Sequence, residues 1–407
     1  MSHTALLRLL LIVTSVIVAA VRADAAFQSQ PFTPEKPEVS FVTVFPGSEI
    51  YELEGHSAIR IRFPDGRDVA FNFGLFDFAK PNFVYRFVKG ETDYMVGAIP
   101  WNYFVESYSG SGRRIEEQPL ALSPAQTSRL LELLEIQLRP ENRTYRYNYV
   151  KDNCATRPLR IVELALGDSI ILAPSSAERE LPALTFRNVM RRYHSNYPWY
   201  QFGIDLALGS GIDYTLDRRE LSFAPVVLVE QLDGATAGGL PVVTGRRIIT
   251  EGTGPTAAAD PTPWYLTPMS VFSILLAIAI ILSIRDIRRG RVSRWFDTAL
   301  FGILGLTGCL LTFLIFVSSH EATSPNWLYA WLNPLCLIPA VFLWLKNGRR
   351  IVIWYQIINF AVLIVLTCTW PLLPQSANPA FLPIVACECV RAASYIFINR
   401  KYIIHER

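Results

Sequence analysis

The sequence predicts an α+β domain outside the cytoplasm, followed by an all-α membrane domain of five helices. The chain has 407 residues, of which 51% are hydrophobic and 18% charged, but these averages combine two unlike parts. Residues 1–263 hold nearly all the acidic side chains, whereas residues 266–398 form a series of apolar runs. The formal net charge of +3 is modest and much of the basic surplus lies between the apolar runs, which argues against nucleic acid as a partner.

An apolar stretch, LLLIVTSVIVAAV, follows Arg8 and ends just before the tripeptide ADA at residues 23–25. It is shorter than the roughly 20 apolar residues that cross a bilayer, and ADA fits the cleavage pattern of a secretory signal peptide. We therefore expect a signal peptide over residues 1–25, cleaved after Ala25, with an uncleaved anchor as the alternative. The domain that follows is then extracytoplasmic.

Alternating apolar residues predict three strands at the start of this domain, over residues 39–45, 58–63 and 69–73. The dipeptide Asp65-Gly66 is typical of a hairpin turn between the last two strands. We expect the domain to extend over residues 39–230. A linker is expected over residues 231–263, because its Gly, Ala, Pro and Thr residues cannot build a core.

Two helices are predicted inside this domain. The motif SPAQ at residues 123–126 combines a Ser cap, a Pro at the first helical position and a Gln three residues after the cap, which predicts a helix that runs to Leu138. The second helix is expected to begin at Asn153 or Cys154 and to run to Leu166, with Gly167 at its end.

Five apolar runs are expected to cross the membrane, over residues 266–284, 296–317, 328–345, 351–370 and 381–398. Lys and Arg crowd the first and third connections and the C-terminal tail, whereas the second and fourth connections carry none. By the positive-inside rule the basic connections face the cytoplasm. The chain is thus expected to be a multi-pass protein of the bacterial inner membrane, with its C-terminus in the cytoplasm and residues 39–230 facing the periplasm or the cell exterior.

Several polar residues of the membrane domain have either a functional or a structural role. Glu388 and Arg391 are three residues apart in the last apolar run, so they are expected to pair on one helix face, either as a functional site or to hold the bundle together. His320, in an outer loop, faces an active site or lies among lipid headgroups. Trp327 and Trp331 are expected at the membrane interface.

Cys154 is the only cysteine ahead of the apolar runs. An unpaired thiol in an oxidising compartment indicates chemistry. At a helix N-terminus it would meet the positive end of the helix dipole, which lowers a thiol pKa, and N–H groups that stabilise an oxyanion. His56, between Gly55 and Ser57 where a loop enters a strand, is the better candidate base, whereas His194 lies in an aromatic and polar loop where a surface role is expected. A lone Cys that is merely a small buried side chain is the alternative.

Three runs of sequence carry a resemblance to a known family. They are PGSEIYELEGHSAIRI, FNFGLFDFAKPNFVYRFVKGETDYMV and ENRTYRYNYVKDNCATRPLRI. Together, over roughly residues 39–230, they resemble the Lnb N-terminal periplasmic domain, and HEATSPNWLYAWLNPL resembles a stretch of the membrane domain of the same family. In that stretch Trp327-Leu328 and Tyr329-Ala330 depart from the family pattern, where a second Asn is expected. The order of His and Asn-Cys is also similar to the lecithin retinol acyltransferase group, which are permuted relatives of papain-like NlpC-type hydrolases.

The resemblance implies an acyltransferase with a permuted papain-like, NlpC-type fold. Lnb proteins move an ester-linked acyl chain of a diacylglyceryl lipoprotein onto its own N-terminal cysteine amine and leave a lyso-form. By this resemblance Cys154 is the nucleophile and His56 the general base. Asn72 is the nearest match to the third, orienting residue. A simple register through the turn at Asp65-Gly66 instead puts residues 75 and 76 opposite His56, so Asp77 or a bulge is an alternative.

The expected partners are diacylglyceryl lipoproteins and membrane lipid, with no cofactor and no metal, because the His and Cys residues lack ligand spacing. Four residues are candidates for substrate binding: Asn153, Arg60, Arg157 and His320. Each has a structural alternative, since Asn153 can cap the Cys154 helix and the two arginines can form ion pairs.

Two other functions remain open from the sequence. A papain-like cysteine peptidase or amidase that acts on cell-envelope peptides would use the same residues but leave the acyl chains of lipoproteins in place. A non-enzymatic membrane protein would keep Cys154 as a buried structural side chain.

Overall fold

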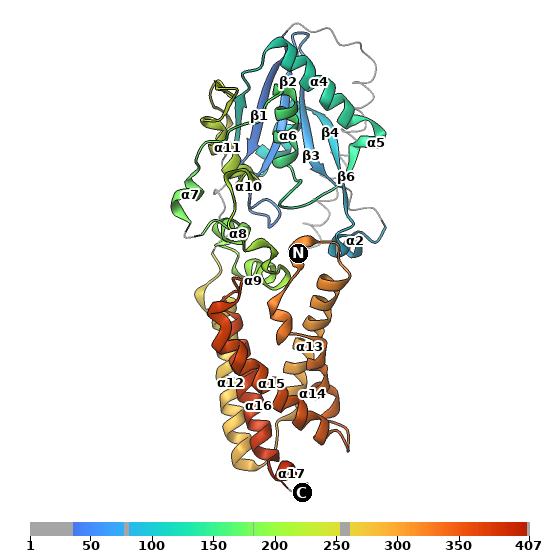
Figure 1. Cartoon of the computed structure of the whole chain (residues 1–407), viewed down its shortest axis with the longest axis vertical. Helices are drawn as coiled ribbons and strands as arrows, with labels where there is room; N and C mark the ends of the chain where they lie inside the picture. The colour runs from blue at the N-terminus through green and yellow to red at the C-terminus, as the bar shows by residue number, and fades with distance from the viewer. Residues whose placement is uncertain (1–35, 77–80, 182, 253–260, 405–407) are drawn as a thin grey trace. The chain divides into compact units, whose positions relative to one another are not determined.

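The computed structural model describes residues 36–76, 81–181, 183–252 and 261–404 (Figure 1). The predicted signal peptide and Asp77 lie outside these residues. The described chain divides into two compact units. The first holds residues 36–87, 91–193 and 215–252, and the second holds residues 88–90, 194–214 and 261–404.

The first unit is built on a seven-stranded sheet in which every neighbouring pair is antiparallel (Figure 1). The strand order is β6-β4-β3-β2-β1-β5-β9. The bounds are β1 (Glu38–Val44), β2 (His56–Arg62), β3 (Asp68–Leu75), β4 (Asp93–Pro100), β5 (Ile115–Pro119), β6 (Thr144–Arg146) and β9 (Arg247–Thr250). The three predicted strands are therefore confirmed as β1, β2 and β3, with the hairpin turn at Asp65-Gly66 between β2 and β3.

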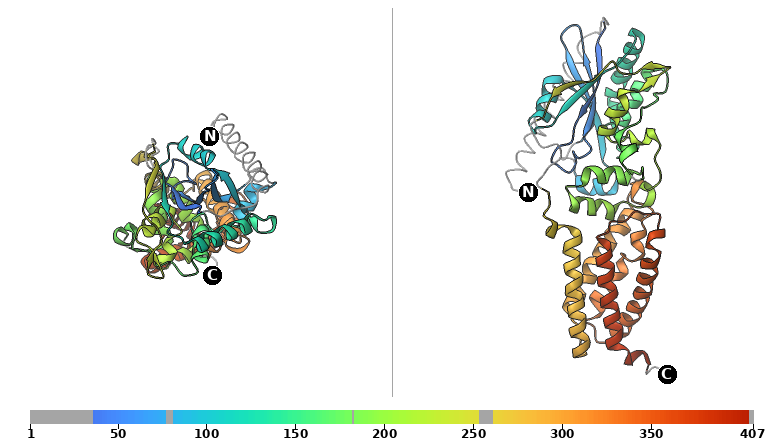
Figure 2. Two further views of the ribbon diagram at one scale, coloured as in Figure 1. Left: turned by 90° about the horizontal axis from the view of Figure 1, so that it is seen from above. Right: turned by 90° about the vertical axis from the view of Figure 1, so that its left-hand side faces the viewer.

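The two faces of the sheet bury different sets of side chains, because successive residues of a strand point to opposite faces. On one face Phe41, Ile59 and Phe71 form a core with Leu159 of α6 (Thr156–Leu166), and this core includes α4 (Pro124–Leu138) and α11 (Pro225–Asp233). The right-hand view of Figure 2 shows the green helices standing on one side of the strands. On the opposite face Ala58 and Ala70 pack with Phe104 of α3 (Trp101–Ser109).

The two predicted helices are confirmed as α4 and α6. Ser123 and Gln126 form the capping box at the start of α4, and α6 ends at Gly167. The remaining elements of the region before the membrane helices are α2 (Phe83–Lys89), α5 (Pro140–Arg143), α7 (Ser176–Glu180), α8 (Phe186–His194), α9 (Pro198–Ala207), η1 (Ser210–Ile212), α10 (Arg218–Leu221), β7 (Thr236–Ala237) and β8 (Leu240–Pro241).

The boundaries of the predicted domain need two corrections. Strand β9 lies inside the predicted linker of residues 231–263, yet it pairs with β5 and completes the sheet. Residues 194–214 lie inside the predicted domain, yet they belong to the unit that contains the membrane helices. In both places long-range pairing decides the assignment, and composition along the chain does not report it.

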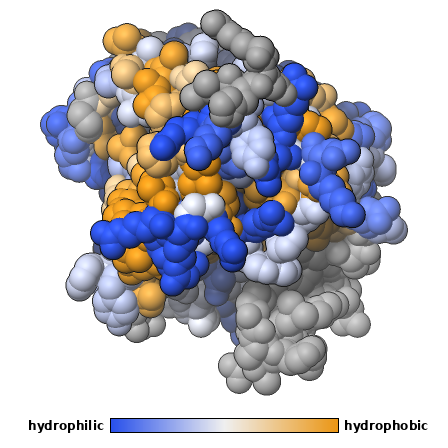
Figure 3. Space-filling model, turned by 90° about the horizontal axis from the view of Figure 1, so that it is seen from below, coloured by the Kyte–Doolittle hydropathy of each residue, from blue (hydrophilic) through white to orange (hydrophobic). Residues whose placement is uncertain are grey.

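Four helices of the second unit are long and apolar enough to cross a membrane, within the residues that the structure describes. They are α12 (Pro268–Arg289), α13 (Arg294–Phe316), α15 (Arg349–Thr369) and α16 (Phe381–Asn399), and they correspond to four of the five predicted spans. Shorter elements accompany them: η2 (Trp264–Leu266), η3 (Glu321–Thr323), η6 (Trp370–Leu372) and α17 (Lys401–Ile404). Seen from below, hydrophilic side chains lie across the end of this unit beside hydrophobic surface (Figure 3).

The predicted span over residues 328–345 is not one helix. It contains three short ones: η4 (Trp327–Ala330), η5 (Pro334–Cys336) and α14 (Leu337–Phe342). Prolines 334 and 339 lack the N–H that a continuous helix needs. The segment runs antiparallel to α13, because Tyr329 Oη lies 3.1 Å from Thr312 Oγ1 and Trp344 Nε1 donates to Thr298 Oγ1 at 2.9 Å. The predicted count of five helices is thus replaced by four long helices and one broken segment.

The buried charges of this unit have different partners from those predicted. Arg391 donates to Asp297 at 2.6 and 3.0 Å and to Asp286 at 3.0 Å, whereas Glu388 accepts from Asn359 at 3.2 Å. A buried guanidinium group is stable only when it is paired with carboxylates, as Arg391 is here. Arg391 therefore joins α12, α13 and α16, and Glu388 joins α16 to α15. The predicted pairing of Glu388 with Arg391 is not the one that forms.

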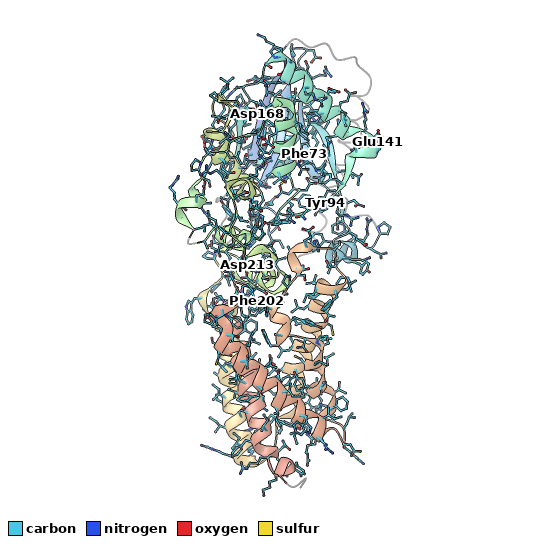
Figure 4. All side chains as sticks on the ribbon, viewed as in Figure 1. Phe73, Tyr94, Glu141, Asp168, Phe202 and Asp213 are labelled. Carbon is cyan, nitrogen blue, oxygen red and sulfur yellow. The ribbon has the colours of Figure 1, made fainter. Side chains whose placement is uncertain are left out.

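Helix α9 packs within the second unit (Figure 4, near Phe202). The Phe202 ring contacts Phe381 at a centroid distance of 4.7 Å. Asn326 donates to the Leu206 carbonyl at 2.9 Å, and Trp199 donates to the Leu266 carbonyl at 2.7 Å. These bonds join residues 194–214 to the loops at the N-terminal end of α12 and the C-terminal end of α13.

Substitution of Gly308 by Ala is expected to destabilise the membrane unit. A Cβ at this position of α13 would lie 2.3 Å from the backbone carbonyl carbon of Asn333, whereas a Cβ at Gly302 would meet its nearest neighbour at 4.0 Å. Overpacking of this kind costs about 1–3 kcal/mol. Thermal unfolding of the purified full chain in detergent should show a lower midpoint for Gly308→Ala and an unchanged midpoint for Gly302→Ala. Equal midpoints would contradict the close approach of the broken segment to α13.

Candidate active site

His56 is the first residue of β2, where the chain enters the sheet from a tight turn. The preceding residue, Gly55, has φ +84°, and a Cβ there would lie 2.7 Å from the Val44 carbonyl oxygen. Only glycine adopts this conformation against that backbone without strain. Gly55 thus fixes the direction in which His56 leaves the turn.

Asn72 of β3 holds the imidazole of His56. The His56 Nε2 atom lies 2.6 Å from Asn72 Oδ1, and Asn72 is 3% exposed. The two side chains lie on one face of the sheet, because Ala58 pairs with Asn72 and stands two residues after His56. With Nε2–H donated to Asn72, the Nδ1 atom carries the free lone pair of the neutral ring.

The predicted register, with residues 75 and 76 opposite His56, is wrong. Arg62 pairs with Asp68, so continuation of this pairing places Gly74 opposite His56. The predicted alternative of a bulge does occur, but between β3 and β4, where the register shifts between Phe73 and Leu75. Gly74, at φ +90°, adopts a backbone conformation there that other residues avoid.

Two further side chains lie next to the His56–Asn72 pair. The Tyr108 ring stacks on the imidazole at a centroid distance of 5.7 Å, and its hydroxyl group is hydrogen-bonded to the Asn72 side chain. The Arg113 guanidinium lies over the Tyr108 ring at 5.1 Å. These contacts restrict the orientation of both catalytic candidates from the α3 side of the sheet.

Cys154 stands in the first turn of the helix that continues as α6. The Asn153 carbonyl accepts the N–H of Arg157 at 3.1 Å, and Asn153 Oδ1 accepts the N–H groups of Ala155 and Thr156 at 2.8 and 3.0 Å. These are the bonds of an N-cap residue. Asn153 therefore positions Cys154 at the N-terminal end of the helix, as the sequence predicts.

The Asn153 amide nitrogen has structural partners as well. It donates to the carbonyl oxygens of Tyr149 at 2.7 Å and Phe223 at 2.8 Å. The side chain is 96% buried by this arrangement. All of its polar atoms thus bind the protein itself, and Asn153 holds the backbone on both sides of Cys154 in place.

Three hydrogen-bond donors converge on the sulfur of Cys154: the backbone N–H of Ser57, the hydroxyl group of Tyr147 and the N–H of Cys154 itself. Ser57 directly follows His56 in the chain, so the bond to its N–H places the sulfur beside the residue after His56 in β2. A Cβ on Gly74 would lie 3.6 Å from Tyr147 Cε2 and 3.8 Å from Cys154 Cβ. The ends of β2 and β3 and the start of α6 therefore meet at the sulfur atom.

Burial keeps both the Cys154 thiol and the His56 imidazole neutral at rest. It raises the pKa of the Cys154 thiol to about 11, although the three donors act in the opposite direction. The imidazole of His56 retains some solvent access, but the side chains packed around it lower its pKa to about 4, as does the charge of Arg113 to a smaller extent, while the bond to Asn72 opposes both. The predicted lowering of the thiol pKa by the helix dipole is thus wrong for the resting site, because desolvation has the larger effect.

The two predicted arginines bind other protein groups. Arg60 donates to Asp68 at 2.6 and 2.9 Å and to Glu117 at 2.7 Å. Arg157 binds Asp152 in a bidentate pair and lies 3.6 Å over the Tyr145 ring. Both guanidinium groups are therefore engaged in the structural ion pairs that the sequence left as the alternative.

The two other histidines of the described chain belong to the second unit. His320 is exposed, in the loop that follows α13. His194 is 1% exposed and its Nδ1 lies 2.8 Å from Gln201 Oε1, so the expected surface role is wrong. Among the described residues no group of His, Cys, Asp and Glu has the arrangement that holds a metal ion.

Sequence reasoning missed Tyr108 and Tyr147. Tyr108 ends the run PWNYFVESY, whose aromatic residues are expected in the core, and Tyr147 lies in a run that predicts a loop and short strand. Neither pattern indicates which atom a tyrosine hydroxyl group contacts. The proximity of YRYNY to Cys154 was the one available signal. The sequence also offered no indication that Tyr94 lies at this site, where it stacks on Tyr147 at a centroid distance of 4.2 Å.

The comparisons with known proteins agree with the two units. Residues 23–192 match the Lnb N-terminal periplasmic domain, and residues 260–402 match the Lnb transmembrane domain. No curated protein and no solved structure gave a significant match.

The pH dependence of Cys154 alkylation tests whether the thiol and the His56 imidazole are neutral at rest. Because the pKa of the thiol is raised to about 11, the rate of Cys154 alkylation by iodoacetamide is expected to rise about tenfold per pH unit from pH 7 to about pH 10 without levelling. Peptide mass spectrometry of the full chain measures this rate, and the unfolded chain, whose rate levels near pH 9, is the control. A plateau below pH 7 would indicate a thiolate and imidazolium pair at rest and would contradict this assignment.

Proposed function

Since the chain belongs to the Lnb family, we propose that it is a membrane-embedded thiol acyltransferase that acts on lipoproteins. It moves an O-acyl chain of a diacylglyceryl lipoprotein onto the amine of the lipoprotein's own N-terminal cysteine and leaves a lyso-form. The observation that supports this most directly is the grouping of Cys154, His56 and Asn72 in the periplasmic domain of an integral membrane protein. The Cys–His–Asn arrangement is that of a thiol nucleophile with an oriented base.

The first half of the reaction forms a thioester. His56 takes the thiol proton through Nδ1, and the sulfur of Cys154 attacks the carbonyl carbon of the acyl ester. A C–S bond forms, the ester C–O bond breaks, and the proton on His56 passes to the departing glyceryl oxygen. The product of this step is the acylated Cys154 and a free hydroxyl on the lipoprotein glycerol.

The second half transfers the acyl group to nitrogen. The α-amine of the lipoprotein's N-terminal cysteine attacks the thioester carbon, a C–N bond forms and the C–S bond breaks. His56 accepts the amine proton and returns a proton to the sulfur, which restores the neutral pair. The amide is more stable than the thioester, so this half drives the sequence forward.

The site geometry suits this chemistry because donors already point at the reacting sulfur. The oxyanion of the tetrahedral intermediate is bonded to the carbon that binds Sγ, so it lies within reach of groups that contact Sγ. Ser57 N–H and Tyr147 O–H are such groups. Donors of this kind act on charge that develops in the transition state and need no reorganisation. A thiol that is neutral at rest receives this stabilisation only when it reacts.

A membrane unit is required by the substrate. Each methylene group buried in the bilayer contributes about 0.8 kcal/mol, so a diacylglyceryl lipoprotein stays in the membrane while it reacts. The four long apolar helices hold the chain in the membrane that contains this substrate. We infer an inner-membrane location with the C-terminus in the cytoplasm, from the basic connections described above.

The direct test is mass spectrometry of lipoprotein N-terminal peptides from a bacterial host without its own N-acyltransferase. The full chain should yield N-acyl, mono-O-acyl cysteine, whereas Cys154→Ala and His56→Ala at matched levels should yield only the diacyl form. Asn72→Ala should lower the conversion by about 10- to 100-fold, since it releases the imidazole but leaves both reacting groups in place. Identical lipid patterns for the full chain and Cys154→Ala would refute the proposal. Cleaved peptides with intact diacyl groups would favour the peptidase.

Tyr147→Phe should slow acyl transfer by about tenfold or more, because it removes a donor to the oxyanion and keeps the aromatic ring. Tyr94→Phe is the matched control, since Tyr94 stacks on Tyr147 at 4.2 Å and also loses only a hydroxyl group. Initial rates with a diacylglyceryl lipopeptide in detergent measure the effect, which should lie in kcat with KM little changed. Equal rates for the two variants would show that the Tyr147 hydroxyl takes no part in the transition state.

A further inference from the structure

A cavity of about 280 Å³ lies in the second unit, at the N-terminal ends of α12 and α16. Three segments line it. His194 and Gln201 come from the end of α8 and from α9, Pro268 and Met269 from the first turn of α12, and residues 378–380 from the loop before α16. The volume is near the lower end of small-molecule sites, so it suits part of a ligand. Since the periplasmic domain precedes α12, this cavity is on the periplasmic side of the membrane.

The polar part of the lining contains an unsatisfied donor. Gln201 is 8% exposed, and its Oε1 lies 2.8 Å from Nδ1 of the buried His194. Its Nε2 has no hydrogen-bond partner in the described protein. A buried amide N–H group without an acceptor is unfavourable. A ligand that satisfies the Gln201 Nε2 donor must place an oxygen acceptor in the cavity.

The charges around the cavity favour a neutral acceptor over a free anion. Helices α12 and α16 both begin here, and the positive ends of their dipoles attract electron-rich oxygen. The Asp205 carboxylate opposes this attraction, because Asn378, a lining residue, donates to it at 3.0 Å. A carbonyl oxygen, which carries a partial negative charge only, matches both features.

The apolar surroundings place the cavity at the depth of lipid ester groups. Trp264 is 79% exposed, and Tyr265, Leu266 and Met269 beside it are exposed as well. The Trp199 indole donates to the Leu266 carbonyl and adds a further exposed ring to this rim. Trp and Tyr gather where the headgroup region meets the hydrocarbon. A ligand at this level has one end in water and one end in the hydrocarbon.

We propose that this cavity binds the glycerol and ester region of a diacyl glycerolipid, with Gln201 Nε2 donating to an ester carbonyl oxygen. The acyl chains leave along the apolar rim into the bilayer. This site is made of second-unit residues alone, so the inference stands whether or not Cys154 transfers acyl groups.

The test uses the full chain in lipid nanodiscs and a photoactivatable diacyl glycerophospholipid with a diazirine near the ester of one chain. Mass spectrometry of the cross-linked peptides should find label concentrated on peptides that contain Met269, Pro198 or Ala380. Unlabelled short-chain diacyl glycerophospholipid should displace it about ten times better than the dialkyl ether analogue, which lacks the carbonyl, because one hydrogen bond to a buried donor is worth about that factor. Label spread evenly over the lipid-facing helices, or equal displacement by ester and ether, would overturn the proposal.

Two variants test whether the labelling depends on Gln201. Gln201→Leu should lower labelling of these peptides about tenfold, whereas Gln356→Leu, a buried position of α15 that does not line the cavity, should leave it unchanged. Equal labelling of the two variants would count against the site. Cys154→Ala should keep full labelling, and a loss there would mean that the label reports the active thiol instead.

Competition also distinguishes the source of the lipid. Stronger displacement by a diacylglyceryl lipopeptide than by phospholipid would assign the cavity to the lipoprotein, and equal displacement would assign it to membrane lipid in general. Both results support an ester-binding site. Displacement by glycerol phosphate alone would replace it with an anion site and overturn the proposal.

Discussion

The geometry of the candidate site depends on the side chain of Asn153. Its oxygen accepts the N–H groups of Ala155 and Thr156, and its nitrogen donates to the carbonyls of Tyr149 and Phe223. A single buried amide thus joins the start of α6, the turn before it and the chain that leads into α11. Loss of these bonds would leave buried backbone groups unsatisfied on three segments, which is unfavourable for each. Cys154 follows this residue directly, so its position is set by the same bonds.

Because Cys154 and His56 are neutral at rest, the thiol is protected from reaction with oxidants and disulfides. A preformed thiolate in an oxidising compartment reacts with oxidants and disulfides at once, whereas a buried thiol with a raised pKa does not. In the proposed reaction, the donors from Ser57 and Tyr147 act only when a substrate carbonyl and His56 draw the proton away. The proposed mechanism therefore combines protection of the Cys154 thiol with stabilisation that depends on the substrate.

Local sequence patterns predicted much of this structure. Strand alternation, the Asp65-Gly66 turn and the SPAQ cap each depend on residues close in the chain, and they were confirmed. The broken segment after α13, strand β9 and the partners of Arg391 depend on residues 90 or more positions apart or on packing around prolines, so they were missed. At the candidate site, the order of the motifs predicted Cys154, His56 and Asn72, and the structure brings His56 and Asn72 into contact. The hydroxyl groups of Tyr108 and Tyr147, and the excess of desolvation over the helix dipole at Cys154, follow only from the packed three-dimensional surroundings.

Residues 194–214 change how this protein can be divided. They are flanked in the sequence by the periplasmic unit, yet α9 packs with the membrane helices, so the chain passes between the units at residues 87–88, 90–91, 193–194 and 214–215. If a single linker connected the two units, one cleavage in that linker would release the first unit intact. Here the same cut would carry α9 away with its apolar Phe202 and Leu206 stripped of their partners. The two units therefore alternate along the chain, and a soluble fragment that ends before α12 is expected to be prone to aggregation.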